Sequence, residues 1–234
     1  GFATTTEVLD GEEVARAPIN APYTAAEIDA VLATMTGELT QIPPMFSAVK
    51  VNGRRLYDYA RHGETVERPE RHVTITSFEQ RQPATYDPTT KTQTIYFTGA
   101  CSKGTYVRTL AVDFGKKLGV PAVMSDLTRL KSGGFTLDET VTFEQIATHV
   151  ATGTAQELLA PIDQALSQYP RVTISSDLWS RVKNGVWLLA EDLAIDDPAA
   201  NPMVALVYQD GLKCLYSYRP EEQRYKPFKM FSVN

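Results

Sequence analysis

The chain has 234 residues, of which 43% are hydrophobic, and its formal net charge at pH 7 is −5. This length can bury one sizeable core, or one core and a small second domain. No apolar run approaches the roughly 20 residues that a transmembrane helix needs. The two cysteines, Cys101 and Cys214, are too few for a disulfide framework, and the three histidines lack the spacing of a zinc site.

The net negative charge argues against a nucleic-acid partner, but the basic residues gather in two segments. Residues 50–61 hold four cations against one acid, and residues 101–131 hold six cations against two acids. A basic face on an acidic body is compatible with RNA binding. The alternative is that these cations belong to ordinary solvated helix faces.

The first 20 residues predict extended backbone, since the threonines at 4–6 favour strands and Asp10-Gly11 favours a turn. Thr24 and Glu27 have the spacing of a capping box, so a helix is expected to follow them and to end at Gly37. The predicted buried face of this helix consists of Ile28, Val31, Leu32 and Met35.

A short element rich in cations is predicted after the first helix. Extended backbone at Pro43-Pro44 leads to a strand at 47–51, a tight turn at Asn52-Gly53 and a helix at 54–61. Cations and aromatic rings together suit phosphate contact and base stacking. The alternative is that the two tyrosines of this helix only pack the element onto the body.

Two antiparallel strands are predicted at residues 71–82 and 91–101, separated by a turn. After the second strand, Gly104 permits a sharp turn, and Thr105 can cap a helix that Gly119 ends. The predicted buried face of this helix consists of Val107, Leu110, Ala111, Phe114 and Leu118.

A strand, a glycine turn and a helix N-terminus form a place where backbone N–H groups and a positive dipole end meet a ligand. Tyr106 and Arg108 lie in the predicted first turn, beside that place. An aromatic ring next to a fixed cation suits a flat, anionic or nucleotide-like ligand. Cys101, at the end of the strand, is expected to be buried and inert rather than a nucleophile.

Residues 125–130 predict a further strand or sheet edge, which Gly133-Gly134 ends. A second capping-box spacing, from Thr142 to Gln145, precedes a short helix through Val150. Residues 154–166 predict a helical piece that a proline breaks.

The sequence pattern changes near residues 167–171, where a domain boundary is expected. Beyond it the sequence predicts strands at 172–174, 203–208, 212–218 and 228–233 and a helical turn at 177–182. Several short strands in so small a segment favour a small β-barrel or sheet.

Two blocks carry a resemblance to a known family. Residues 101–119 read CSKGTYVRTLAVDFGKKLG, which closely resembles the core motif of TruB-type tRNA pseudouridine synthases. Residues 42–61 read IPPMFSAVKVNGRRLYDYAR, which resembles the family segment IPPxxSAxKxxGxxxYxxAR. Both blocks stand in family order and spacing, and residues 1–11 fit the family's threonine-rich stretch less well. The resemblance covers residues 1 to about 165 and, more weakly, the rest.

The resemblance implies an α+β fold, with a mostly antiparallel sheet, flanking helices and a small C-terminal β-rich domain of the PUA kind. We expect a catalytic domain at 1–168, with a thumb-like, RNA-contacting insertion at 42–68, and an RNA-binding domain at 169–234. The implied activity is isomerisation of the T-loop uridine of tRNA to pseudouridine, with no metal and no cofactor. The implied setting is a cytoplasmic monomer that binds the T-arm stem-loop of tRNA and no membrane.

The resemblance also assigns three residues to the catalytic site. Tyr106 matches a tyrosine that stacks near the base, Arg108 matches the arginine that pairs with the catalytic aspartate, and Leu127 matches an apolar residue that packs on the target. For Leu127 an ordinary core position is the alternative. The residues expected to bind RNA are Lys50, Arg54, Arg55, Tyr57, Arg61, Lys103 and Arg129.

One departure from the family is serious. The family's nucleophile is an aspartate in a G-x-L-D-P-x-A-x-G-x-L motif, which is nowhere in this chain, and Asp10 lacks the following proline and alanine. The family tends to an acid where Val8 stands, and Glu7 is adjacent. Because the chain starts with Gly1 rather than Met, we expect that the segment with the nucleophile has been removed and that the chain binds RNA better than it catalyses. The alternative is a non-catalytic RNA-binding or RNA-folding protein of the same fold.

Overall fold

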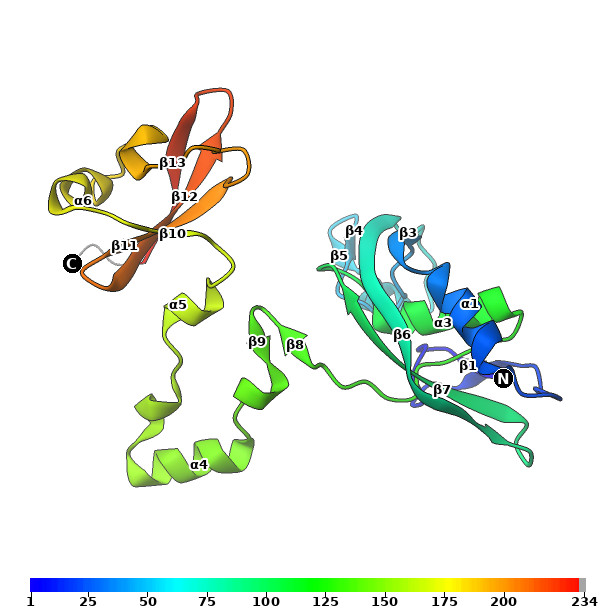
Figure 1. Ribbon diagram of the computed structural model, residues 1–234. Coiled ribbons are helices and arrows are strands. Elements are labelled where there is room, and N and C mark those ends of the chain that lie inside the picture. The colour runs from blue at the N-terminus through cyan, green and yellow to red at the C-terminus, as the bar shows by residue number, and fades with distance from the viewer. Residues whose placement is uncertain (232–234) are drawn as a thin grey trace. The chain divides into compact units, whose positions relative to one another are not determined.

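The structure of the chain is a computed structural model that describes residues 1–231 (Figure 1). The chain divides into two compact units, the first ending at Leu127 and the second beginning at Thr128. Each unit has its own buried apolar cluster.

A three-stranded antiparallel sheet organises the first unit. Its strands, in spatial order, are β3 (Gly37–Gln41), β6 (Arg71–Asp87) and β7 (Thr92–Cys101). The hairpin predicted at 71–82 and 91–101 is confirmed, although its first strand continues to Asp87. The hairpin turns there because the Asp87 carboxylate accepts the N–H of Thr89 at 2.8 Å.

Two helices, α1 (Ala25–Ala33) and α3 (Val107–Leu118), cover one face of this sheet (Figure 1). The buried cluster between them and the sheet consists of Ile28, Leu32, Met35, Val73, Ile75, Phe78, Leu110 and Phe114. These side chains come from α1, the turn after it, β6 and α3. The core of the first unit therefore fixes the position of α3 against the sheet.

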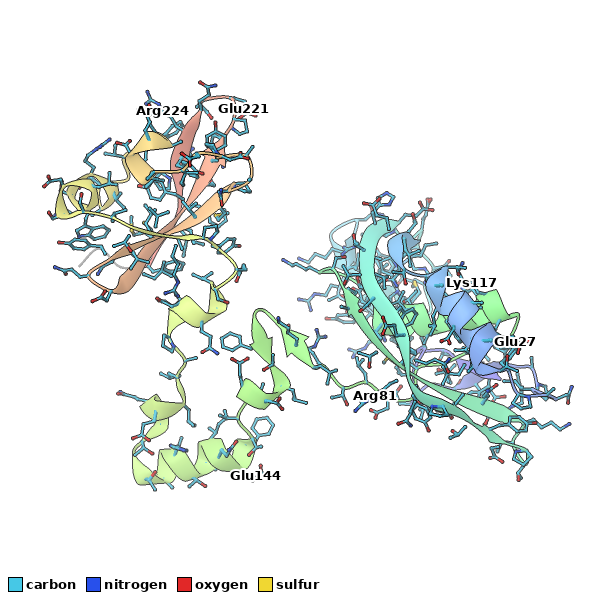
Figure 2. All side chains as sticks on the ribbon, in the orientation of Figure 1. Glu27, Arg81, Lys117, Glu144, Glu221 and Arg224 are labelled. Atoms are coloured by element: carbon cyan, nitrogen blue, oxygen red, sulfur yellow. The ribbon has the colours of Figure 1, made fainter. Side chains whose placement is uncertain are left out.

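Helix α1 begins as predicted and ends early. In the capping box, the Glu27 N–H donates to Thr24 Oγ1 at 3.3 Å and the Thr24 N–H donates to Glu27 Oε2 at 2.8 Å. Figure 2 labels Glu27 at this end of α1, where a carboxylate complements the helix dipole. The prediction that α1 ends at Gly37 is wrong, because Gly37 has φ +99° and opens β3, which the sequence analysis did not predict.

Helix α3 begins one residue later than predicted. Tyr106, and not Thr105, is the N-cap residue, because the Thr105 hydroxyl donates to the Ser102 carbonyl at 2.8 Å in the preceding turn. Gly104 has φ +90° and Gly119 has φ +78°, which confirms the predicted turn and the predicted C-cap.

The remaining elements of the first unit are short: β1 (Phe2–Thr4), β2 (Glu13–Arg16), β4 (Lys50–Val51), β5 (Arg54–Arg55) and α2 (Leu56–Arg61). Strands β4 and β5 form a hairpin around Asn52 and Gly53, which confirms the predicted tight turn. The strand predicted at 47–51 is shorter than expected, because its first residues form a loop in which the Ser47 N–H donates to the Met45 carbonyl at 2.9 Å.

Residues 128–166 of the second unit form short elements in which no residue is buried. These are β8 (Lys131–Ser132), β9 (Phe135–Thr136), η1 (Leu137–Glu139), α4 (Phe143–Thr152), η2 (Ala155–Leu158) and α5 (Ile162–Ala165). The capping box before α4 is confirmed, with the Gln145 N–H donating to Thr142 Oγ1 at 3.2 Å. The strand predicted at 125–130 is wrong, because this stretch pairs with no other strand and Asp126 Oδ1 accepts the N–H of Leu127 at 2.7 Å.

A four-stranded sheet organises the rest of the second unit. Its strands, in spatial order, are β10 (Arg171–Thr173), β11 (Met203–Tyr208), β12 (Gly211–Arg219) and β13 (Arg224–Met230), and α6 (Ser176–Val182) and η3 (Glu191–Leu193) connect β10 to β11. The strands predicted at 203–208 and 212–218 are confirmed. The strand predicted at 228–233 begins earlier and ends at Met230, and its residues 232–233 lie outside the described residues.

Apolar side chains cover both faces of this second sheet. Along β11, Val204 and Leu206 belong to one buried cluster, while Ala205 and Val207 belong to another. This alternation is what the period of a strand requires when both faces are covered. In this sheet β10 pairs with β11 in parallel and the other neighbours are antiparallel. Mostly antiparallel sheets with helices packed on them confirm the predicted α+β fold class.

Candidate active site and nucleic-acid interface

Three segments meet at the N-terminus of α3. The Arg108 guanidinium donates from Nη1 to the Thr6 carbonyl at 3.3 Å and from Nη2 to the Phe46 carbonyl. Arg108 is half-buried, and within residues 1–231 it forms no ion pair with a carboxylate. A guanidinium that is fixed by two neutral carbonyls keeps its positive charge for an anion.

Glu7 brings a carboxylate to the same place. Its Oε2 accepts the Thr109 hydroxyl at 3.1 Å, and its backbone has φ +64°, which is uncommon for a glutamate. Burial raises the pKa of the Glu7 carboxyl above its ordinary value of 4.5, although the Thr109 hydrogen bond and the charge of Arg108 oppose this shift. Val8, where the family tends to an acid, pairs instead with Met124 in a parallel bridge.

The backbone of Tyr106 is held by a buried glutamine. Gln41, at the end of β3, accepts the Tyr106 N–H at 2.7 Å through Oε1 and donates through Nε2 to the Tyr106 carbonyl at 3.0 Å. The sequence analysis missed Gln41. The available signal was a polar residue on the inward side of a strand, two residues after Leu39 and two residues before the proline pair.

The hydroxyl of Ser47 is buried and has no hydrogen-bond partner among the described residues. Ser47 directly follows Phe46, whose carbonyl holds Arg108, and its own carbonyl accepts the N–H of Tyr57 at 3.1 Å. Buried hydroxyls are normally paired, so the Ser47 hydroxyl is an exception, and it lies next to the residue whose carbonyl holds Arg108.

Five predicted RNA-binding residues share the basic element, which we define as residues 50–64. Lys50 and Arg55 are direct partners across the β4–β5 hairpin, so their side chains lie on one face. The guanidinium carbons of Arg55 and Arg61 lie 5.6 and 5.2 Å from the centre of the Tyr57 ring. Within residues 1–231 neither arginine has a carboxylate partner. The result is an aromatic ring flanked by cations whose charge is not neutralised.

Arg54 differs from its neighbours on this element. Its Nη1 donates to both carboxylate oxygens of Glu64, at 3.0 and 2.8 Å, and its Nη2 donates to the Asp58 carbonyl at 3.0 Å. Its guanidinium also stacks 4.5 Å from the centre of the Tyr59 ring. The charge of Arg54 is therefore used inside the basic element. Tyr59 contacts residues of that same element, since its hydroxyl also donates to the Val51 carbonyl at 3.1 Å.

The other predicted RNA-binding residues and Leu127 belong to other segments of the chain. Lys103 is exposed in the turn between β7 and α3, and Leu127 is 48% exposed at the end of the first unit rather than in a core. Arg129 is exposed and belongs to the second unit. Asp10 is exposed and accepts the Thr6 hydroxyl at 3.0 Å.

The expectation that Cys101 is buried is wrong, because it lies exposed at the end of an edge strand. Cys214 is the buried cysteine, and burial raises the pKa of its thiol to about 12. Within residues 1–231, no three His, Cys, Asp or Glu side chains come together as a group of metal ligands. No helix in this same range has the length and apolar character needed to cross a membrane.

Comparison with protein families matches two models that together cover most of the chain. Residues 1–107 match the N-terminal domain of the TruB family of pseudouridylate synthases. Residues 108–167 match the C-terminal domain of tRNA pseudouridylate synthase B. The junction between these matches falls at the start of α3, between Tyr106 and Arg108.

Curated relatives align with the whole chain. The tRNA pseudouridine synthase B of Lactiplantibacillus plantarum is 76% identical over 234 residues, which are 100% of this chain and 76% of the relative. The corresponding protein of Levilactobacillus brevis is 54% identical over the same shares of the two chains.

Solved structures share the fold at low sequence identity. A Cbf5–Nop10–Gar1 complex contains a chain with a TM-score of 0.61 and 19% identity, and an H/ACA RNP bound to a substrate RNA containing 2′-deoxyuridine contains one with a TM-score of 0.62 and 18% identity. Each match covers 92% of this chain and 63% of the other. With the family models and the curated relatives, these matches lead to one conclusion: the chain belongs to the TruB family of pseudouridylate synthases.

Proposed function

We propose that this chain forms the RNA-binding surface and most of the active site of a tRNA pseudouridine synthase that isomerises the T-loop uridine. The observation that carries the proposal is the state of Arg108: half-buried, fixed by the Thr6 and Phe46 carbonyls, and in no salt bridge among the described residues. Such a cation suits an incoming carboxylate, the group with which the family's arginine pairs. The names of the 76% and 54% identical relatives support the choice of substrate.

The reaction is an isomerisation, so its atoms and electrons balance without a co-reactant. A carboxylate attacks the ribose or the base, and the glycosidic bond to N1 breaks. The uracil then turns and bonds again through C5 while the carboxylate is released; C5 gives up its proton and N1 takes one up. The target base is first flipped out of the RNA fold. In this scheme Arg108 holds the attacking carboxylate ionised and aimed, and the ring of Tyr106 stacks beside the base.

Neither acid near Arg108 is proposed as the nucleophile. Glu7 Oε2 is already occupied, because it accepts the Thr109 hydroxyl at 3.1 Å. Asp10 is bonded to Thr6 within its own exposed turn. The attacking aspartate is expected in the family's Leu-Asp-Pro motif, which these 234 residues do not contain.

The RNA contacts follow from the basic element and the turn before α3. Lys50, Arg55 and Arg61 contact phosphates, and Tyr57 offers a ring for stacking. Like charges directly across a hairpin destabilise it, so the pairing of Lys50 with Arg55 favours an anion between them. Lys103 and Leu127 complete the proposed surface of the first unit, and Arg54 organises the basic element. Arg129 is proposed to contact RNA from the second unit.

The wider setting is proposed on the same grounds. Residues 42–68 act as the thumb-like insertion of a catalytic domain at 1–168, and residues 169–234 act as a PUA-like RNA-binding domain. The four-stranded sheet with both faces covered supports an independently packed C-terminal domain. The protein acts as a cytoplasmic monomer on the T-arm stem-loop of tRNA.

The test uses a T-arm stem-loop carrying tritium at C5 of its uridines. The 234-residue chain and the full-length product of the gene are each assayed for binding and for tritium release. We expect both proteins to bind and the full-length product to release tritium. Binding by both without release by either would favour the alternative, a non-catalytic RNA-binding protein, and no binding by either would refute the proposal.

A further inference from the structure

We propose that Gln41 is a positioning residue, which fixes the Tyr106 ring and the start of α3 by pairing its side-chain amide with the Tyr106 backbone. The catalytic meaning of this inference rests on the proposed function. The contact joins two residues that are 65 positions apart. It links the end of β3 to the N-terminus of α3, where Tyr106 and Arg108 lie.

The pairing is complete on both sides. The Tyr106 N–H donates to Gln41 Oε1 at 2.7 Å, and Gln41 Nε2 donates to the Tyr106 carbonyl at 3.0 Å. Gln41 is only 3% exposed, so water does not compete for these bonds. Two bonds from one planar amide fix both the position and the orientation of the Tyr106 peptide.

This pairing holds α3 at its N-cap residue, Tyr106. Tyr106 is the N-cap residue with extended backbone, φ −98° and ψ 105°, and no side chain caps the helix. Its carbonyl already accepts the N–H of Leu110 at 3.1 Å, and Thr105 is occupied by its bond to Ser102. Gln41 therefore fixes the residue at which α3 begins, and Arg108 follows two positions later.

The chain contains a matched control in which the same chemistry serves another tyrosine. The Tyr23 N–H donates to Gln93 Oε1 at 2.8 Å, and Gln93 Nε2 donates to the Tyr23 carbonyl at 2.9 Å. The Tyr23 hydroxyl donates to the Leu118 carbonyl at 3.0 Å, at the opposite end of α3. Substituting Gln93 thus removes the same kind of pairing away from the proposed active site.

The first experiment compares Gln41→Ala with Gln93→Ala in the full-length gene product. Single-turnover tritium release and stem-loop affinity are measured separately. We expect Gln41→Ala to slow release by roughly 10- to 100-fold, the loss typical of a small misplacement of a catalytic group, with affinity changed less than about threefold. Gln93→Ala should leave both unchanged. Equal losses in the two variants, or a loss confined to affinity, would overturn the inference.

A second variant, Gln41→Glu, tests for rescue by a conservative change. When the introduced carboxyl group is protonated, it carries one O–H donor and one carbonyl acceptor, as the pairing requires, whereas the ionised carboxylate can only accept. The release rate of Gln41→Glu should therefore rise toward that of the native protein as pH falls, relative to Gln41→Ala at each pH. A constant ratio between the two variants across pH would count against the pairing.

Amide hydrogen exchange in the 234-residue chain tests the contact without any turnover. We expect the Tyr106 amide to exchange at least about tenfold faster in Gln41→Ala while the Tyr23 amide is unchanged, and the reverse in Gln93→Ala. Unchanged exchange at Tyr106 would overturn the inference. Absence of tritium release from the native full-length gene product would instead refute the proposed function. The exchange result alone would then decide whether Gln41 positions Tyr106.

Discussion

At the scale of single residues, the three arginines of the basic element carry the same charge but differ in whether a carboxylate pairs with them. Arg55 and Arg61 flank the Tyr57 ring without a carboxylate partner within the described residues, so both are available to phosphates. We expect Arg55→Ala and Arg61→Ala each to weaken stem-loop binding and to lower the slope of log affinity against log salt concentration by about one. Binding titrations at several salt concentrations measure this slope, and an unchanged slope would remove that arginine from the interface.

Arg54 provides the internal comparison. Its guanidinium is bonded to Glu64 and to the Asp58 carbonyl and stacks on Tyr59, so its removal disorganises the basic element rather than deleting a phosphate contact. We expect Arg54→Ala to lower the melting temperature, whereas Arg55→Ala leaves it unchanged. Thermal unfolding of the two variants separates the roles, and the opposite ranking would contradict them.

Glu7 carries a prediction about pH. Burial raises the pKa of its carboxyl above 4.5 in the folded chain, so the folded state holds this proton more tightly than the unfolded state. Stability is therefore lost as pH rises through the window between the unfolded value and the raised folded value. Glu7→Gln keeps an acceptor for the Thr109 hydroxyl without the charge.

The Glu7→Gln variant should consequently gain stability relative to the native chain as pH rises through that window. Urea unfolding of both proteins in steps from about pH 4 to 7 measures the difference in unfolding free energy. A difference that does not vary with pH, or that falls as pH rises, would show that burial does not dominate at Glu7.

At the scale of elements, α3 depends on a close approach in its middle. A Cβ on Gly115 would lie 2.4 Å from the Ala122 Cβ and 2.7 Å from the Val120 carbonyl oxygen. Alanine normally improves a helix by about 1 kcal/mol over glycine, but here the clash is with backbone that packs against the helix. We expect Gly115→Ala to destabilise the chain by roughly 1–3 kcal/mol in urea unfolding. Lys117→Ala, an exposed change in the same helix, is the control, and a stabilised Gly115→Ala would contradict the packing.

The elements also show where sequence reasoning succeeds. Local signals that are complete within a few residues, such as the capping boxes at Thr24 and Thr142 and the Asn52-Gly53 turn, predict what the structure has. Strand β3 was missed because its pairing with β6 joins residues far apart in the chain. The prediction of a strand at 125–130 was wrong, because a strand also needs a partner strand to pair with and this stretch has none.

The sequence predicted only part of the candidate site as well. Tyr106 and Arg108 follow from the motif, because ring, cation and helix N-terminus are neighbours in sequence. Gln41 and the ties of Arg108 to Thr6 and Phe46 do not, since each depends on contacts over 60 or more positions. Long-range bonds of this kind are visible only once the fold is known.

At the scale of the whole molecule, an acidic chain carries a local basic surface. The net charge is −5, yet Lys50, Arg55 and Arg61 lie together without carboxylate partners in the part of the chain that the structure describes. The local arrangement of charge, and not its total, therefore governs the proposed RNA contact. For the same reason Arg108 is the central residue of the proposed site, because it is a half-buried cation at the α3 N-terminus that forms no salt bridge among the described residues.

The most direct test of that claim is single-turnover tritium release by the full-length gene product carrying Arg108→Ala, measured together with stem-loop affinity. We predict that release slows by roughly 10²- to 10³-fold, the loss typical of removing one preorganised electrostatic group, while affinity falls only modestly. Near-normal release by Arg108→Ala would contradict the account and remove Arg108 from catalysis.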